Sequence, residues 1–573
     1  LGGKMSYIIK PDFSSEETFF LLSTWLNFFA PQTPIYDRPL LVNIPILFDE
    51  LCFFSEKISK NDRWHSTCAQ ILEEIKFFID DDIILKKYYP HIFINIRKYS
   101  YDRKIYYWAQ SIRIDLQDYF EHVREECQNI VIAGEIKRKK DLIFLLSTLF
   151  TQARYYGFKD KELDFSSDIY FSQKPSEIID AIFGVIYGAK KIFSCYIKMT
   201  GDIGVIRSFI AYSRLVQVSG PLKPSGGAIA DYMRNSADSI FVLINIDATS
   251  PYIAAEKAYN EVKRNLDIVN FCFSEEYIII EDEVGVKCGE NTDCIVSLSR
   301  KSGVFSVQPK KDARAYIGKI IDSFSGKCIP NNLSSSLELF SLATKHQDVS
   351  VKFISTWMAL EAIASSGDGN IIDGMCENLT SIFSLNLIPS KIKNIAIQLQ
   401  KIKQGNLPNL SRYLPNSRTR IDKDELFMLL RENNSSNQSI FCTDLNCNPY
   451  IRYSATVLSN HIKSLQLIRR FIQRDKKLHE FQLRRIYRTR NMLFHSGEKL
   501  HLIEYNLEIL KYYYILSVYS IFERCIVGKF NSTIEALNWY NLRYQYVNDK
   551  NVDKIGVKYI LHKTRISSTY MIS

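Results

Sequence analysis

Apolar side chains recur every three or four residues over most of this 573-residue chain, and this spacing restricts the fold more than any other feature. Residues 68–78, 141–150 and 351–365 each form such a run, which is the spacing of one helix face. Helices of this kind bury their apolar faces by packing against one another. We therefore predict a mainly α fold, with a helical N-terminal regulatory or sensor region over residues 5–200. Two short apolar runs within that region, residues 44–48 and 92–96, are candidate strands.

The middle of the chain changes character. Residues 239–247 (SIFVLINID) are rich in β-branched side chains and bounded by polar residues, which predicts a strand. A helix should follow from Pro251 to about Asn270, because proline suits the first helical position. Residues 277–281 and 294–298 predict two more strands. Together these elements predict a small α/β domain over residues 201–333, smaller than the helical regions on either side.

The helical spacing returns after residue 333 and continues nearly to the end of the chain. A polar stretch rich in Asn and Ser, residues 432–450, predicts an exposed loop. Predicted helices around it are residues 337–344, 351–365, 454–477, a further helix ending near 495, and residues 502–527. Helices joined by short links pack as antiparallel neighbours. We therefore predict a C-terminal antiparallel helical bundle over residues 334–540, followed by a basic tail over residues 541–573.

The net charge of +10 is unevenly distributed. Residues 381–573 hold 30 Lys and Arg against 14 Asp and Glu, whereas the preceding residues hold 43 against 49. A basic end on an otherwise neutral-to-acidic chain indicates contact with a polyanion such as a nucleic acid. A solvated basic face without a partner would have the same composition, so charge alone leaves both interpretations open.

Cysteine and hydropathy patterns predict the class of protein. The 12 cysteines are spread singly, as is typical of a reducing cytoplasm, and no stretch of about 18 apolar residues predicts a membrane span. Residues 1–4 precede Met5, which we take as the natural start. The pairs Cys442–Cys447 and Cys288–Cys294 each lack the second pair that a zinc site needs. We therefore expect a cytoplasmic protein without a metal or cofactor.

The helix predicted over residues 483–494 carries an unusual set of polar side chains. Its apolar stripe consists of Leu483, Ile486, Tyr487, Leu493 and Phe494, with Arg490 among them. Beside the stripe run Arg484, Arg488, Asn491 and His495, and Gly497 then suits the end of the helix. An arginine on a core-facing stripe is costly unless a polar or anionic group meets it. The pattern indicates a shared site near the helix end.

These residues resemble a known family. The segment Arg490–His495 (RNMLFH) resembles the R-x4–6-H motif of the HEPN superfamily, with a polar residue directly after the arginine. Residues 357–362 (WMALEA) resemble the early helix of the Apea-like HEPN group found in phage-defence proteins. The resemblance covers about residues 335–540. It implies a helical bundle that forms a homodimer, with two such motifs facing each other, and that cleaves RNA without a metal.

The resemblance also implies roles for individual residues. His495 would act as the acid or base on the 2′-hydroxyl or the leaving oxygen, and Arg490 would bind the phosphoryl oxygens. Asn491 would hold the imidazole or the phosphate. Products would be a 2′,3′-cyclic phosphate and a 5′-hydroxyl. The side chains expected to contact RNA phosphates, unless they form only a solvated face, are Arg484, Arg488, Lys476 and Lys477. Glu361 is either a partner of this site or a surface charge.

The function that these features predict is an endoribonuclease effector of anti-phage abortive infection. The N-terminal region would sense a trigger, such as a phage-encoded protein, and tRNA is the first candidate substrate. One alternative is a HEPN module that binds nucleic acid or a nucleotide without cutting it. Another is a scaffold in a larger defence complex. A salt-sensitive interaction with RNA would separate phosphate contacts from apolar docking.

Two structural alternatives to the catalytic assignment also remain open. Arg490 could be a buried arginine paired with a carboxylate such as Glu361, and His495 could stabilise the helix end through the helix dipole. A second copy of the motif spacing, Arg474 to His479, has a mostly charged interior and no glycine after its histidine. We therefore expect the site at Arg490 and not at Arg474.

Overall fold

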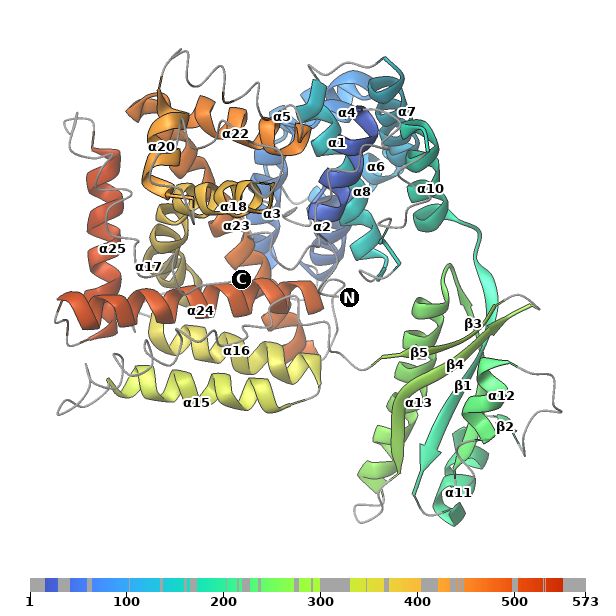
Figure 1. Cartoon of the computed structure of the whole chain (residues 1–573). Coiled ribbons are helices and arrows are strands. Elements are labelled where there is room, and N and C mark those ends of the chain that lie inside the picture. The colour runs from blue at the N-terminus through green and yellow to red at the C-terminus, as the bar shows by residue number, and fades with distance from the viewer. Residues whose placement is uncertain are drawn as a thin grey trace. The chain divides into compact units, whose positions relative to one another are not determined.

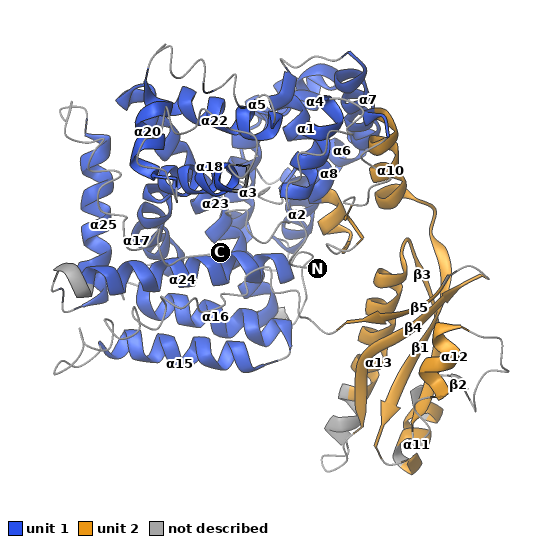
Figure 2. Cartoon of the chain, viewed as in Figure 1, with its two compact units in different colours: residues 1–151, 166–175, 304–573 blue, residues 152–165, 176–303 orange. Residues whose placement is uncertain are grey.

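The computed structural model describes most of the chain. The described residues are 16–28, 42–58, 64–102, 104–133, 138–158, 162–164, 173–201, 203–213, 216–218, 227–234, 239–272, 278–289, 292–298, 330–346, 348–364, 370–402, 421–432, 441, 445, 448–496, 503–528, 530 and 532–549. The chain divides into two compact units (Figure 2). The larger comprises residues 1–151, 166–175 and 304–573, and the smaller comprises residues 152–165 and 176–303. The N-terminal and C-terminal helices, predicted as separate domains, therefore share one unit.

The N-terminal part of the larger unit is helical, as predicted. Its helices are α1 (Glu16–Asn27), α2 (Ile44–Ile58), α3 (Trp64–Phe78), α4 (Ile83–Tyr88), α5 (Pro90–Lys98), α6 (Ile105–Asp115), α7 (Tyr119–Ile132) and α8 (Lys139–Tyr155). The two candidate strands were wrong. Asn43 accepts a hydrogen bond from the Ile46 amide at 2.9 Å and starts α2, while Pro90 starts α5. Proline belongs to the first helical turn at both places, and short apolar runs do not distinguish strand from helix.

The C-terminal part of the larger unit is also helical. Its helices are α15 (Asn331–Lys345), α16 (Val349–Ala364), α17 (Ile371–Leu385), α18 (Leu387–Ile402), α20 (Lys423–Arg431), α22 (Pro449–Ile462), α23 (Leu465–Ser496), α24 (Ile503–Gly528) and α25 (Thr533–Asn548). Residues 478–495, predicted as a separate helix, instead continue α23. Helices α15, α16 and α24 pack side by side (Figure 1). The predicted basic tail begins inside α25, and residues 550–573 lie outside the described residues.

Large aromatic side chains fill the core of these C-terminal helices. Phe353 and Trp357 of α16 and Tyr513 and Tyr514 of α24 are among the largest fully buried side chains. Among the described residues, no helix is long and apolar enough to cross a membrane.

The smaller unit is built around a five-stranded sheet in the order β2-β3-β1-β4-β5. Its elements are α10 (Pro175–Tyr187), β1 (Lys191–Thr200), α11 (Ile203–Ser213), β2 (Val216–Val218), α12 (Ala228–Arg234), β3 (Ile240–Ala248), α13 (Pro251–Cys272), β4 (Ile279–Cys288) and β5 (Thr292–Ser297). The predictions for β3, α13 and β5 are confirmed within two residues, whereas the strand predicted over residues 277–281 covers only the start of β4. Strand β1 was missed, because it falls within residues predicted as helical. Every strand pair is antiparallel.

Side chains on both faces of this sheet are buried. Tyr196 of β1 clusters with Ile229 and Met233 of α12. Its neighbours Cys195 and Ile197 point to the opposite face by strand alternation, and both are fully buried. Gly285 of β4 lies where α12 comes close, since a Cβ there would be 3.3 Å from both Ile229 and Tyr196. The sheet therefore forms the central layer of this unit.

Candidate functional site on helix α23

All predicted site residues except Glu361 lie on α23. This 32-residue helix contains no glycine or proline, and its apolar side chains keep one helical stripe. Buried positions alternate at spacings of four and three residues along it: Ile468, Ile472, Asp475, His479, Gln482, Ile486, Thr489 and Leu493. This is the spacing of a helix face packed against neighbouring helices. Half of these positions are polar, so α23 brings polar groups into the core.

Arg490 is half-buried near the C-terminal end of α23. Its Nη1 donates a hydrogen bond to Oδ1 of Asn491 at 3.1 Å, and its Cζ lies 4.9 Å from the ring centroid of Phe494. Its buried Nε has no hydrogen-bond partner, and none of the described residues forms an ion pair with it. An arginine without a carboxylate partner keeps most of its donors for an anion.

His495 belongs to the backbone of α23, but its side chain lies outside the described residues. Its position is one turn after Asn491, and residues four apart lie on one helix face. The structure therefore brings Arg490 and Asn491 together and leaves the third predicted catalytic side chain as a prediction. Gly497, expected at the helix end, is likewise outside the described residues.

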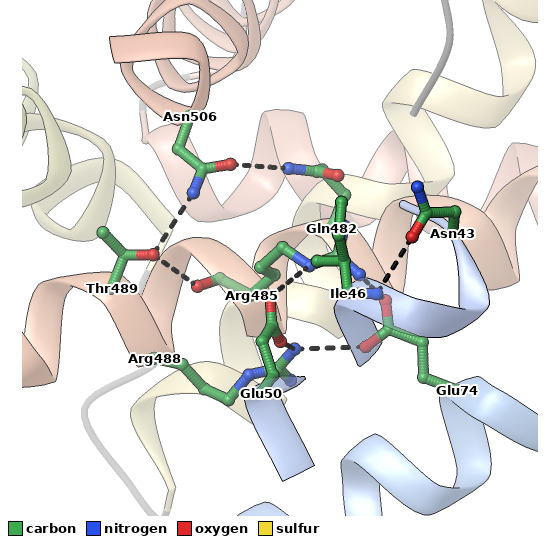
Figure 3. Close-up of polar contacts among 9 residues, drawn as sticks. All are labelled: Asn43, Ile46, Glu50, Glu74, Gln482, Arg485, Arg488, Thr489 and Asn506. Atoms are coloured by element: carbon green, nitrogen blue, oxygen red, sulfur yellow. Dashed lines mark hydrogen bonds and ion pairs between the residues drawn. The ribbon is translucent and has the colours of Figure 1, made fainter. Parts of the chain in front are cut away.

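Arg488 does not line an exposed surface, contrary to our prediction. Its side chain is 5% exposed, and its Nη2 lies 2.9 Å from Glu50 Oε2 and 3.1 Å from Glu74 Oε2. Arg485 pairs with the same carboxylates, with Nε 3.4 Å from Glu50 Oε1 and Nη2 in contact with Glu74 Oε1. Figure 3 shows both arginines reaching from α23 to glutamates of α2 and α3. We call these four residues the charge cluster.

The charge cluster has two positive and two negative groups in a buried place. Burial alone would lower the pKa of Arg488, but the charges of Glu50 and Glu74 outweigh it and raise the pKa above its ordinary value. A buried arginine needs such partners, because desolvation of an isolated charge costs several kcal/mol. Arg488 is therefore committed to the fold and cannot serve as an RNA contact in this conformation.

Sequence reasoning missed the other three members of the charge cluster. A signal was present for Glu74, which follows Ile71 by three residues on the apolar stripe of α3. A carboxylate on a core-facing stripe predicts a buried partner. The sequence does not show which residue this partner is, because Arg485 lies 411 residues further along the chain.

A network of uncharged polar side chains ties α23 to α24 near the charge cluster. Asn506 of α24 donates a hydrogen bond to Thr489 Oγ1 at 3.2 Å and accepts one from Gln482 Nε2 at 3.3 Å. Thr489 in turn donates to the backbone oxygen of Arg485 at 3.1 Å. Figure 3 shows this network beside the four charges. Contacts to α2, α3 and α24 thus fix the position of α23, and the nearest of them lie within one helical turn of Arg490.

The other predicted RNA contacts are partly occupied by protein groups. Arg484 Nη2 lies 2.6 Å from Asp373, and Lys477 Nζ lies 2.8 Å from Glu73. Lys476 is half-buried with its Nζ 4.3 Å from the ring centroid of Tyr544, and burial lowers its pKa. These side chains lie on the same helix but do not converge on Arg490.

Glu361 does not pair with Arg490 in the described part of the chain. Its Oε2 instead accepts a hydrogen bond at 2.8 Å from Nε1 of Trp357, one turn earlier on α16. Trp357 packs against Tyr487 of α23, with ring centroids 5.6 Å apart. Glu361 therefore affects α23 only indirectly, because it accepts the hydrogen bond of the buried Trp357 indole, and that indole packs against α23.

The two residues of the second motif copy, Arg474 and His479, lie in different surroundings. His479 is 4% exposed, with Nδ1 2.6 Å from the Tyr513 hydroxyl and Nε2 3.1 Å from Asp475. Arg474 points elsewhere, pairing with Asp81 at the surface. The histidine is thus part of the core and the arginine is not beside it, so this copy does not form a joint site.

The described residues contain no candidate metal site, and the comparisons with known proteins identify no relative. Within the described ranges, no group of three or more His, Cys, Asp or Glu side chains could hold a metal ion. Cys288 and Cys294 lie on the paired strands β4 and β5, whereas Cys442 and Cys447 are outside the described residues. Comparisons with protein-family models, with curated proteins and with solved structures give no match.

Proposed function

We propose that this chain is a HEPN-type endoribonuclease that cleaves RNA without a metal, with its site at the C-terminal end of α23. The observation that carries the proposal is the state of Arg490. Its guanidinium is half-buried beside Asn491, without a carboxylate partner among the described residues, on the helix that also contains His495. Arg485 and Arg488, which are buried more deeply on the same helix, are each paired with carboxylates, as a structural arginine should be.

The residues of the motif suit phosphodiester cleavage by the neighbouring 2′-hydroxyl. Arg490 can donate two hydrogen bonds to phosphoryl oxygens and stabilise the charge that develops on them. A histidine side chain has an ordinary pKa of about 6.5, so His495 would be suited to move a proton from the 2′-hydroxyl or to the 5′-leaving oxygen. Asn491 already accepts a bond from Arg490 and so positions that guanidinium. The products would be a 2′,3′-cyclic phosphate and a 5′-hydroxyl.

RNA would contact the surface of α23 through Arg484 and Lys477. Both now form surface ion pairs, with side-chain exposures of 22% and 37%. Such pairs contribute only about 0–1 kcal/mol, so a phosphate can replace Asp373 or Glu73 at little cost. Arg488 is excluded from this role by its burial.

We infer that the active form is a homodimer and an effector of anti-phage defence. Phe494, next to Arg490, is 59% exposed, which suits a face that meets a second copy. The charge cluster supports control by the N-terminal region, because α2 and α3 hold the helix that carries the motif. A phage-encoded trigger recognised by these helices could thereby affect the site. We take tRNA as the first substrate to test.

The test is incubation of the purified chain with total RNA in EDTA, with mapping of new 5′ ends. We expect discrete cleavage that leaves 5′-hydroxyl ends and falls at least about 100-fold in Arg490→Ala and His495→Ala. Arg474→Ala is the matched control, since it removes an exposed arginine of the same helix, and it should cleave like the wild type.

Two outcomes would contradict the proposal. Cleavage that survives both Arg490→Ala and His495→Ala would place the activity elsewhere. Silence of the wild type, even with extract from infected cells, would refute the enzyme. Salt-sensitive RNA retention that His495→Ala leaves intact would then favour the non-catalytic HEPN module.

A further inference from the structure

Strand β5 forms one edge of the sheet in the smaller unit, and β4 is the only described strand that pairs with it. The Leu298 amide, directly after β5, donates a hydrogen bond to the Asp282 oxygen of β4 at 2.6 Å. Backbone groups of a strand point alternately to its two sides, so those of Asp293 and Ile295 point away from β4. Within the described ranges, no hydrogen bond to these outward groups is present. The edge therefore offers unused backbone donors and acceptors.

The sequence of β5 does not protect this edge. Edge strands are usually kept from pairing by lysine, proline, a bulge or a very short length. β5 contains no lysine, arginine or proline, and its register with β4 is continuous. Its one charged residue, Asp293, turns onto the sheet face, where Oδ1 accepts a hydrogen bond from the Ile229 amide of α12 at 3.1 Å. The opposite edge strand, β2, has only three residues. β5 is therefore the edge of this sheet that is open to pairing.

The side chains of β5 also suit a strand with neighbours on both sides. Thr292, Ile295 and Val296 are β-branched, and such residues favour strands. Ile295 packs against the buried cluster between the sheet and α12, yet it and Val296 are only partly buried. A further strand beside β5 would cover the remaining apolar surface of both side chains.

The edge is complementary to itself. If two copies of β5 run antiparallel about a twofold axis at Ile295, each Ile295 lies opposite the other and exchanges two backbone hydrogen bonds with it. The residue opposite Asp293 is then the partner's Ser297, which carries no charge. An axis at Asp293 would instead place two carboxylates opposite each other, which is unfavourable. An axis at Cys294 would align fewer of the outward residues. A second copy of the chain thus fits this edge in one preferred register.

We propose that β5 of one copy pairs with β5 of a second copy and joins the two sheets into one continuous sheet. The inference does not depend on the proposed ribonuclease, because the smaller unit contributes no residue to the site on α23. A contact this short is at the low end of interface sizes, so we expect a dissociation constant on the order of 100 μM. Such a contact dissociates at the lower concentrations of a chromatography column.

The test is sedimentation equilibrium of the full chain, from micromolar to several hundred micromolar. It is done in the Phe494→Asp background, which removes the dimer proposed for α23. Ile295→Lys and Ile295→Glu should each weaken self-association at least about 10-fold, because like charges then face each other across the axis. An equimolar mixture of the two variants should restore association, because opposite charges then face each other. Ile192→Lys is the matched control, since Ile192 is 70% exposed on β1 of the same sheet, and it should associate like the parent.

Hydrogen exchange gives a readout that needs no substitution in β5. The Ile295 amide should become protected as the concentration rises, whereas the Leu298 amide, bonded to β4, should be protected throughout. Circular dichroism checks that each variant is folded. Exchange at Ile295 that does not depend on concentration would overturn the proposal. So would association that Ile295→Lys leaves unchanged, or a mixture that associates no more tightly than either variant alone.

Discussion

Replacing Glu74 by glutamine should strongly destabilise the larger unit. Glu74 is 1% exposed and contacts both arginines of the charge cluster, while Glu50 supplies the second carboxylate. The wild-type cluster is neutral, with two positive and two negative groups. The variant would keep Arg485 and Arg488 buried beside a single carboxylate. One positive charge would then be buried without compensation.

The size of the effect follows from these contacts. At about 4 Å and an effective dielectric constant of about 20, each pair of opposite charges is worth about 4 kcal/mol. Glu74 makes two such pairs. The loss is partly offset because the carboxylate no longer has to be desolvated, and because its repulsion with Glu50 disappears. Breaking a buried pair on one side costs about 3–5 kcal/mol in total, and we expect a value in this range.

The measurement is urea unfolding followed by circular dichroism, with Glu73→Gln as the matched control. Glu73 is the preceding residue of α3 and forms a surface ion pair with Lys477, at 60% exposure. Its replacement should cost less than about 1 kcal/mol. A Glu74→Gln variant that is no less stable than Glu73→Gln would refute the view that the charge cluster is compensated and buried.

A double variant separates lost charge balance from lost packing. Glu74→Gln combined with Arg488→Met leaves Arg485 and Glu50, which pair at 3.4 Å, as a balanced couple. We expect the double variant to be more stable than Glu74→Gln alone, because the uncompensated charge is removed. Additive destabilisation by the two changes would show that packing dominates.

Two further predictions concern Asp82 and Phe494. Burial raises the pKa of Asp82 to about 6, against about 3.9 in the unfolded chain. The stability that its proton contributes is therefore fully present below about pH 4 and is lost as pH rises through about 6. It amounts to about 3 kcal/mol relative to Asp82→Asn, and urea unfolding of both proteins at pH 4 and 7 would test this. A constant difference would contradict it. Phe494→Asp should abolish the proposed dimer in light scattering after size-exclusion chromatography, and a persisting dimer would place the interface elsewhere.

Local patterns predicted many of the helices and three strands. The apolar runs at residues 68–78 and 141–150 lie in α3 and α8, and the helix from Pro251 spans Pro251–Cys272. These predictions succeed because periodic burial depends on neighbours within one element. The pattern failed for residues 44–48 and 92–96, which are too short to show a period, and for β1, which lies in a region read as helical.

In the candidate site, too, the sequence predicted the surroundings of some side chains and not of others. The sequence placed Arg490 inside an apolar stripe, and the structure finds it half-buried beside Asn491. From the sequence, Arg484 and Arg488, one turn apart on the same helix, were both predicted to contact RNA phosphates. The structure separates them, since Arg484 pairs with Asp373 at the surface and Arg488 is buried. Which side of a helix meets another element is not a local property.

What the sequence by itself determined is therefore the mainly α character, the order of the elements around a small sheet, and the polar set near the end of α23. Only the tertiary structure decided that Glu50 and Glu74 neutralise Arg485 and Arg488 from more than 400 residues away. The physical reason is that a charge is neutralised by whichever opposite charge lies within a few ångströms. That distance is set by how the apolar faces of α2, α3 and α23 pack, and not by spacing along the chain.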